Sequence, residues 1–350
     1  MTAILNQDLT PRELEIATVS QLLNRESLSE AQSETFFAAV ARGEIDPIVL
    51  AAVLTALKLN GETAAEIAGA AKAFRAAATP LPATDLAVID CCGTGGDGSN
   101  TINISTTAAI VAAAMGLKVA KHGNRSVSSQ SGSADLLEQL GIAIQMSPQQ
   151  AAQTLATAGV SFLFAPVYHS GIRHAMTVRS ALKSRTLFNL LGPLLNPAAP
   201  KFQLLGVYDK ALCPVLAQAL LQLGVERAWV VHGEGCDEIA LHGVTDVCEV
   251  RDGQLHQFRL TAADFGLSPV PLEALRGGKP AENADATRNI LAGKAPQAHR
   301  DAIAANVAAM LKICGQGEDL AANTQAVLDL LATDQAMTTL QQFREASHGN

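Results

Sequence analysis

The first 80 residues carry apolar positions at helical spacing and no alternating pattern of the kind that strands show. A helix is expected to begin at Pro11 behind the capping residue Thr10, because apolar residues recur on one face after it. Three further helical segments are bounded by caps and turn signals, at residues 29–43, 46–61 and 63–77. Thr79-Pro-Leu-Pro82 then breaks the pattern. The sequence predicts a small helical domain over residues 1–82.

From Leu86 onward, short apolar runs alternate with amphipathic stretches. The runs with the length and composition of strands are residues 86–91, 117–120, 143–145, 161–164, 204–207, 228–232 and 245–251. Helices are expected between them at residues 106–115, 133–140, 148–158 and 210–223, and again over 283–346. This alternation predicts an α/β domain with a mostly parallel central sheet.

Residues 172–200 carry helix-like sequence broken by Pro and Gly, without a strand pattern. We expect this segment to cross back to the helical domain. The predicted division is therefore 1–82 with 172–200 for the helical domain, and 83–171 with 201–350 for the α/β domain.

A glycine-rich loop, Gly93-Thr-Gly-Gly-Asp-Gly98, follows the first predicted strand. The polar segment 99–107 and the start of a helix come directly after it. A strand, a glycine-rich turn and a helix N-terminus in this order form an anion site, because backbone N–H groups converge there and the helix dipole adds to them. A purely structural turn is the alternative, but four glycines in six residues cost conformational entropy without adding to a core.

A second polar segment, Lys121-His-Gly-Asn-Arg-Ser-Val-Ser-Ser129, follows the next predicted strand and precedes the helix start Gly132-Ser-Ala-Asp135. A loop with cations on one side and a helix N-terminus on the other is typical of a phosphate clamp, although a solvated surface loop has the same composition. Two anion sites so close together suggest a ligand with two phosphate groups.

The glycine loop also satisfies the dinucleotide pattern G-x-G-x-x-G. That fold requires an acidic residue near the end of the following strand to bind the ribose hydroxyls, and Lys121 stands there instead. This argues more strongly against NAD than against NADP. The Walker pattern of P-loop nucleotidases is absent from the sequence.

Asp237 and Glu238 follow the predicted strand 228–232. Adjacent carboxylates on a loop are ordinarily solvated, but ligands of open α/β sheets bind beyond the C-terminal ends of strands. Carboxylates at that edge can hold Mg²⁺ shared with substrate oxygens, and Ser105 can add a hydroxyl ligand. Elsewhere, Arg173, Arg179, Lys183 and Arg185 form a cationic set of which one member can face the cleft and bind a carboxylate.

The composition fits an enzyme acting on a small phosphorylated substrate. The net charge of −8, with two Tyr and one Trp, argues against a general nucleic-acid binder. The six cysteines form no C-x-x-C pair and have the pattern of reduced thiols. The N-terminus has no signal-peptide pattern and no apolar run is long enough to span a membrane, so we expect a cytoplasmic protein.

Together these motifs resemble the anthranilate phosphoribosyltransferase family, from about residue 10 to residue 335. The resemblance rests on an ordered set of motifs: residues 93–97, 103–106, 121–125, 132–135, 185–189, 192–193, 196–197 and 231–233 with Asp237 and Glu238. One departure is Tyr168-His-Ser-Gly171, where many members have a His-His-Pro-like run.

The resemblance implies transfer of phosphoribosyl from phosphoribosyl pyrophosphate to the amine of anthranilate in tryptophan biosynthesis, with Mg²⁺, two ions per subunit. It also implies a helical domain hinged to an α/β domain of the nucleoside phosphorylase and phosphoribosyltransferase class, and a homodimer through the helical domain. The residues implied for phosphoribosyl pyrophosphate are Gly93, Gly96, Asp97, Thr101, Asn103, Ile104, Ser105, Thr106, Lys121, His122, Gly123, Asn124, Arg125, Ser126, Val127, Ser128, Ser129 and Ser133. Those implied for anthranilate are Gly93, Asn124 and Arg179, and those for metal are Ser105, Asp237 and Glu238. No residue is assigned as a general base, and neither nucleic acid nor a membrane is an expected partner.

Two rival functions remain at this point. A pyrimidine nucleoside phosphorylase has a similar fold but a different phosphate motif from residues 121–125. A non-enzymatic relative that binds nucleic acid needs a basic groove, against which the acidic balance of the chain argues.

Overall fold

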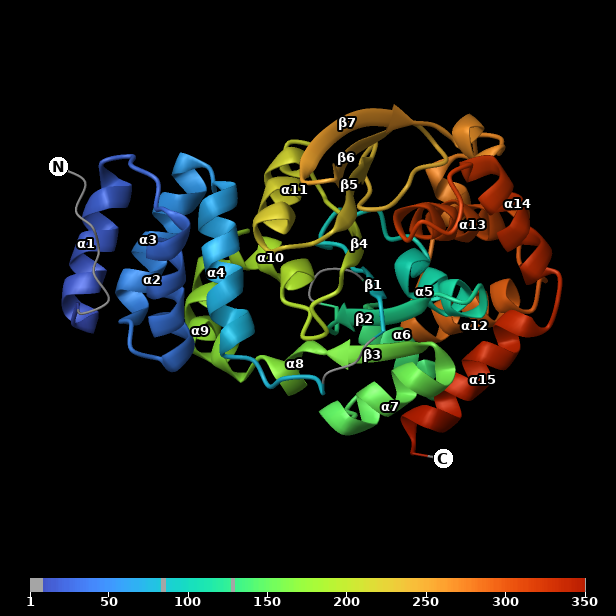
Figure 1. Ribbon diagram of the computed structural model, residues 1–350, viewed down its shortest axis with the longest axis horizontal. Coiled ribbons are helices and arrows are strands. Elements are labelled where there is room, and N and C mark those ends of the chain that lie inside the picture. Colours follow the sequence, from blue (N-terminus) through green and yellow to red (C-terminus); the bar gives the residue numbers. More distant parts are fainter. Residues whose placement is uncertain (1–8, 83–85, 127–129, 350) are drawn as a thin grey trace.

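A helical part and a larger α/β part lie side by side in the structure (Figure 1). The structure is a computed structural model that describes residues 9–82, 86–126 and 130–349. Within those residues, no helix is long and apolar enough to cross a membrane.

Four N-terminal helices make up most of the helical part. They are α1 (Pro11–Leu23), α2 (Glu30–Arg42), α3 (Pro47–Asn60) and α4 (Ala64–Ala76). The hydroxyls of Thr10, Ser29 and Thr63 cap α1, α2 and α4, and in each case the third helical residue returns a hydrogen bond to the cap. All four predicted helices are confirmed.

The α/β part is built on one seven-stranded sheet. Its strands are β1 (Val88–Cys91), β2 (Lys118–Gly123), β3 (Val160–Phe164), β4 (Phe202–Gly206), β5 (Arg227–Gly233), β6 (Thr245–Arg251) and β7 (Gln254–Leu260), in the order β3-β2-β1-β4-β5-β6-β7. Neighbours from β3 to β5 are parallel, and β6 and β7 are antiparallel. The predicted fold class, with a mostly parallel sheet, is confirmed.

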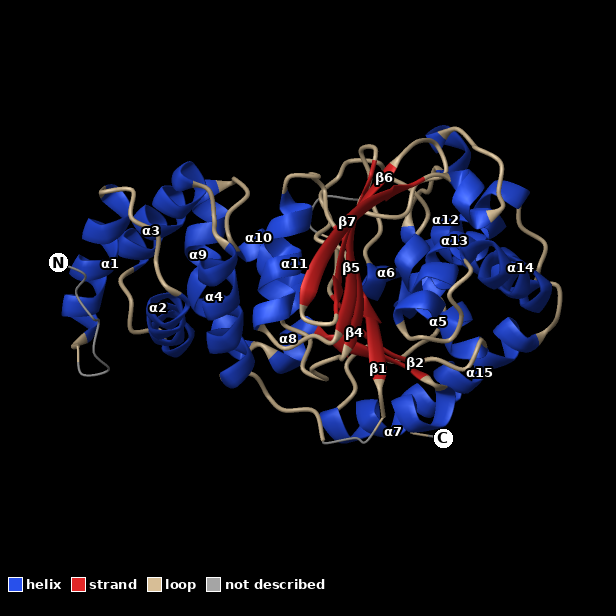
Figure 2. Ribbon diagram, turned by 45° about the horizontal axis from the view of Figure 1, so that its top comes forward, coloured by secondary structure: helices blue, strands red, loops and turns tan. Residues whose placement is uncertain are grey.

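Helices cover both faces of the sheet (Figure 2). α11 (Leu212–Gln222) lies on the face toward the helical part, where it contacts β5, β6 and α4. The other face is covered mainly by α5 (Ile104–Ala114) and α13 (Gln297–Ile313), which also pack on each other. The remaining helices of the α/β part are α6 (Ser133–Gln139), α7 (Pro148–Ala158), α12 (Pro280–Leu291), α14 (Leu320–Leu331) and α15 (Gln335–Ser347).

The segment between β3 and β4 enters the helical part. It contains the short helices α8 (Ala165–Tyr168) and α10 (Phe188–Leu191), and between them α9 (Arg173–Leu182), which contacts α2 and α3. The backbone carbonyls of Gly192, Pro193 and Leu194 then each meet a side chain from a different element: His122 of β2, Gln203 of β4 and Arg75 of α4. Polar side chains from both parts thus hold the chain where it returns to the sheet.

Three details of the sheet differ from the sequence predictions. Residues 143–145 form no strand, although Ile142, Ile144 and Met146 are buried as an alternating pattern requires. Strand β7 was missed because its side chains are largely exposed and polar. Strand β2 runs three residues further than predicted, to Gly123, because the backbone of residues 121–123 pairs with Phe162–Phe164 of β3.

Candidate active site

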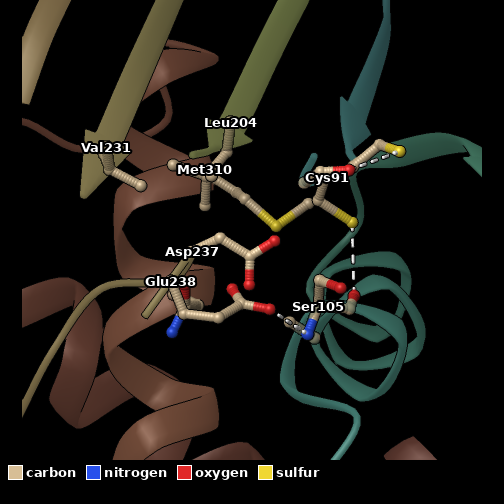
Figure 3. Close-up of a pocket in the computed structure, with 12 residues that line it drawn as sticks. Cys91, Ser105, Leu204, Val231, Asp237, Glu238 and Met310 are labelled. Carbon is tan, nitrogen blue, oxygen red and sulfur yellow. Dashed lines mark hydrogen bonds between the residues drawn. The ribbon is translucent and has the colours of Figure 1, made fainter. Parts of the chain in front are cut away.

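Four of the predicted functional residues, Gly93, Ser105, Asp237 and Glu238, meet where the C-terminal ends of β1, β4 and β5 face the N-terminus of α5. A cavity at this edge is lined by Cys91, Gly93, Ser105, Asp237, Glu238 and Met310, among others. In Figure 3 the carboxylates of Asp237 and Glu238 point into the same space, with Ser105 opposite them. The structure therefore brings together the three residues predicted to bind metal.

The glycine loop after β1 wraps around Asp237. The N–H of Gly95 donates to Asp237 Oδ2 at 2.8 Å, and Asp97 Oδ2 accepts from the backbone N–H of Asp237 at 3.3 Å. A Cβ on Gly93 would lie 2.4 Å from Asp237 Oδ2, so only glycine permits this approach. The loop is thus shaped around the carboxylate, which a plain turn would not require.

Asp237 and Glu238 are partly buried. Ionising their carboxyl groups is therefore unfavourable unless a positive charge lies nearby. Burial, followed by the charge of Asp97, raises the pKa of Asp237 to about 7. Burial and the charge of Asp237 raise the pKa of Glu238 to about 8, and Glu238 Oε1 accepts from the Ser105 N–H at 3.2 Å. The alternative that these carboxylates are simply solvated is wrong.

This donor set suits a divalent cation only if other ligands complete it. In the part of the chain that the structure describes, no group of three or more His, Cys, Asp or Glu side chains is arranged to hold a metal ion. Two carboxylates and the Ser105 hydroxyl leave coordination positions for water or substrate oxygens, as Mg²⁺ sites that bind substrate phosphates do.

Lys121 is buried behind the cavity, with 3% of its surface exposed. Its ammonium donates to the Cys91 carbonyl at 2.5 Å and to Ser105 Oγ at 3.4 Å. The alternative of a solvated surface loop is therefore wrong for this residue, because Lys121 belongs to β2 and its charge lies beside Ser105.

The described residues after β2, 124–126, differ in their contacts, whereas the sequence predicted one common role in binding phosphate. Arg125 is exposed and forms ion pairs with Asp135 and Glu138, so its charge is engaged by α6. Asn124 Oδ1 accepts from the Arg125 N–H, and Ser126 N–H donates to Asp135 Oδ2. Val127, Ser128 and Ser129 lie outside the described residues.

The N-terminus of α5 and the residues before it bond to two other segments of the chain. Thr106 Oγ1 donates to Ser133 Oγ at 3.1 Å, and the Asn103 amide bonds to Ser131. Thr101 forms an isolated antiparallel bridge with Arg276. Ile104 begins the helix and is buried.

Two predicted side chains point elsewhere. The His122 ring is buried against His169 and bonds through Nδ1 to the Gly192 carbonyl, which corrects the expectation that its side chain faces a ligand. Burial lowers the pKa of His122 to about 3, so the ring is neutral. The Arg179 guanidinium lies 5.3 Å from the centre of the Phe188 ring, and the residue is not among those that line the cavity.

Arg185 reaches the glycine loop, although the sequence analysis assigned it no ligand. Its guanidinium donates to the Gly96 carbonyl and stacks 3.9 Å from the centre of the Tyr208 ring. Arg185 stands just after α9, so it links the crossing segment to the loop after β1. Among the four cations of this region, Arg185 alone belongs to a motif of the family resemblance, residues 185–189, and that motif could have pointed to it.

Comparisons with known proteins agree with this architecture. Residues 16–78 match the helical bundle domain of the glycosyl transferase family, and residues 85–337 match its a/b domain. A protein from Vibrio cholerae named anthranilate phosphoribosyltransferase is 54% identical over 327 residues, which are 93% of this chain and 98% of that protein. One of the same name from Aeromonas salmonicida is 54% identical over 330 residues, covering 94% of this chain and 98% of that protein.

Solved structures give the same result. The crystal structure of anthranilate phosphoribosyltransferase from Thermus thermophilus superposes with a TM-score of 0.90 at 41% identity, covering 95% of this chain and 99% of that one. The Saccharomyces cerevisiae enzyme in complex with phosphoribosyl pyrophosphate and Mg has a TM-score of 0.88 at 28% identity, covering 97% of this chain and 99% of that one. The resemblance seen in the sequence is confirmed, and the chain belongs to the anthranilate phosphoribosyltransferase family of glycosyl transferases.

Proposed function

We propose that the chain transfers the phosphoribosyl group of phosphoribosyl pyrophosphate to the amine of anthranilate, releasing pyrophosphate, in tryptophan biosynthesis. The observation that carries this most directly is the cavity in which Asp237 and Glu238 face Ser105 at the start of α5, with Lys121 behind it. Such a site provides both the acidic ligands for a cation and the positive surroundings for phosphate.

Phosphoribosyl pyrophosphate binds, in this proposal, between the glycine loop and the N-terminus of α5. Three of the four glycines of that loop, Gly95, Gly96 and Gly98, have φ values of 64°, 76° and 78°, which turn the backbone as an anion-binding loop requires. The dipole of α5 and the charge of Lys121 add to the positive potential there. The Ser133 and Asn124 side chains complete the set on the side of β2.

Magnesium fits this site because the negative charge of Asp97, Asp237 and Glu238 is incompletely neutralised within the protein. Asp237, Glu238 and Ser105 would hold it, and we propose two ions per subunit. When bound, it would neutralise the charge that develops on the departing pyrophosphate.

For anthranilate we propose Gly93, Asn124 and Arg179. An aromatic amine is neutral at pH 7, so its lone pair can attack the ribose carbon without prior deprotonation, and the protein needs no dedicated general base. Arg179 reaches the substrate carboxylate only if its side chain leaves the face of Phe188, a rearrangement that belongs to this proposal.

We also propose a homodimer through the helical part and a cytoplasmic location. Exposed apolar side chains on α1, α3 and α9 support the dimer: Ile16, Leu23, Ile48, Leu59 and Met176. All six cysteines are free thiols, as is usual in a reducing compartment. The crossing of residues 172–200 into the helical part supports a hinge between the two domains.

The decisive experiment is the decay of anthranilate fluorescence with purified protein, phosphoribosyl pyrophosphate and Mg²⁺. Consumption is expected only when both are present. Folded protein that leaves the fluorescence unchanged under these conditions would refute the proposed activity.

A further inference from the structure

The N-terminus of α5 lacks the side-chain cap that its sequence offers. Asn103 occupies the N-cap position, where asparagine is among the strongest capping residues. Its side chain nevertheless makes no capping hydrogen bond to the helix. Its side-chain oxygen instead accepts from the Ser131 hydroxyl at 3.1 Å and from Asn283 on another helix, 180 positions further along the chain.

Asn283 of α12 holds the Asn103 oxygen. Asn283 Nδ2 donates to Asn103 Oδ1 at 2.7 Å, while the Asn103 amide nitrogen donates to the Ser131 carbonyl at 3.0 Å. Asn283 Oδ1 in turn accepts from the Gly278 N–H at 2.7 Å. Because both amides have a backbone partner, their orientations are determined.

Asn283 is buried, with 2% of its surface exposed. The segment before α12 also supports the polar segment 99–107, since the Leu275 carbonyl accepts from the Ile102 N–H and the Gly277 N–H donates to the Asn100 carbonyl. The contact of Asn283 with Asn103 therefore adds a side-chain hydrogen bond to two backbone hydrogen bonds between the same two parts of the chain.

We infer that Asn283 is a positioning residue for phosphoribosyl pyrophosphate, an inference that rests on the proposed function. Together with Ser131, it keeps the Asn103 oxygen away from the first turn of α5. The Ser105 N–H of that turn donates to Glu238 Oε1, and the Thr106 N–H is left for phosphate. Without Asn283, the Asn103 side chain keeps only its bonds to Ser131 and rotates more readily to cap its own helix. In that position it competes with substrate phosphate for the Thr106 N–H.

The test is the affinity for phosphoribosyl pyrophosphate with Mg²⁺, measured by calorimetry on the whole chain. Asn283→Ala should weaken binding about fivefold, the equivalent of the roughly 1 kcal/mol of a side-chain cap. In turnover assays the KM for phosphoribosyl pyrophosphate should rise by a similar factor, with kcat and the KM for anthranilate nearly unchanged. If the alanine variant does not fold, Asn283→Ser replaces it, because its side chain ends one atom short of the amide nitrogen.

Thr287→Val is the matched control. Thr287 lies one helical turn beyond Asn283 and makes the other buried polar contact between α12 and α5, to Thr107 at 2.9 Å. It should lower the melting temperature by a similar amount and leave phosphoribosyl pyrophosphate affinity unchanged. An equal loss of affinity in this variant would reduce Asn283 to a packing role and overturn the inference.

A double-variant cycle tests whether the effect passes through Asn103. In an Asn103→Ala background, Asn283→Ala should cause no further loss of affinity. Additive losses would overturn the inference, as would wild-type affinity in the Asn283→Ala single variant. Wild-type protein that binds no phosphoribosyl pyrophosphate would refute the proposed function, and the inference with it.

Discussion

Replacing Asp237 with Asn and Glu238 with Gln should stabilise the metal-free protein while removing its response to magnesium. Both carboxylates are partly buried, and the described residues that line the cavity include no cation, so ionising the two carboxyl groups is unfavourable. Lys121 lies behind the cavity, beside Ser105. The amides keep the shape of the side chains and remove the charge. The double variant should therefore separate the effect of the two charges on the stability of the protein from their role in binding magnesium.

The magnitude follows from the pKa values. The pKa of Glu238 rises from 4.5 to about 8, and that of Asp237 from 3.8 to about 7. At 1.36 kcal/mol per pH unit, and after allowance for partial solvent access and for the coupling of the two groups, ionising the pair costs on the order of 2–3 kcal/mol. Removing that cost should raise the melting temperature by roughly 2–5 °C at pH 8.

The pH dependence has a definite sign. Between the unfolded pKa values near 4 and the folded values of about 7 and 8, the native site holds more protons than the unfolded chain. The free energy of unfolding of the metal-free protein should therefore fall as pH rises from about 5 to 8, and the variant should lack this part of the decline. Added Mg²⁺ should stabilise the wild type more at pH 8 than at pH 6, because protonation competes with the metal.

Differential scanning fluorimetry at varied pH and Mg²⁺ concentration measures the change in melting temperature, its pH dependence and the response to the metal. Anthranilate fluorescence measures turnover. Glu273→Gln is the control, since Glu273 is exposed and remote in sequence from the acidic pair. A Mg²⁺ titration of the variant that superimposes on the wild type would refute the metal role. A variant less stable than wild type at pH 8 without metal would refute the electrostatic argument.

Two further substitutions test the substrate contacts. Lys121→Ala removes the cation beside Ser105. It should lower kcat/KM for phosphoribosyl pyrophosphate ten- to a hundredfold, because a charged hydrogen bond contributes ~1.5–3 kcal/mol. Unchanged affinity by calorimetry would exclude Lys121 from phosphate binding. Arg179→Ala should raise the anthranilate KM by about tenfold or more, because a guanidinium can bind a carboxylate at two points, whereas Arg173→Ala, an exposed cation of the same helix, should do little. A large effect of Arg173→Ala alone would show that the substrate carboxylate binds Arg173 and not Arg179.

The helical part could be predicted closely because its boundaries are local. Thr10, Ser29 and Thr63 each cap a helix within three residues, and such signals need no knowledge of the rest of the fold. The hairpin between β6 and β7 also has a local turn signal, although β7 itself lacks the apolar pattern of a buried strand. Asp252 and Gly253 both have positive φ, as the Asp-Gly turn of a two-residue hairpin requires.

The end of β2 could not be predicted from the local sequence, because it depends on pairing with β3. Lys121 and His122 have the composition of a loop, yet both are buried because they pair with Phe162 and Leu163 of β3. A buried lysine is tolerated only where polar groups receive its charge, and here the Cys91 carbonyl and Ser105 hydroxyl come from β1 and α5. The sequence predicted Lys121 to bind phosphate but did not predict its place behind the cavity.

The candidate site residues that the sequence predicted are those whose chemistry is unusual for their position. They are glycines in a run, adjacent carboxylates after a strand, and a cation where a dinucleotide fold needs an acid. Asn283 has no such mark, since an asparagine within a helix is ordinary and its partner is 180 residues away. Its importance depends on what Asn103 would otherwise do, and asparagine at an N-cap has a strong local preference that only a tertiary contact can override. The residues that keep a binding site open are therefore harder to find from sequence than those that bind, because their effect is to prevent an ordinary local structure from forming.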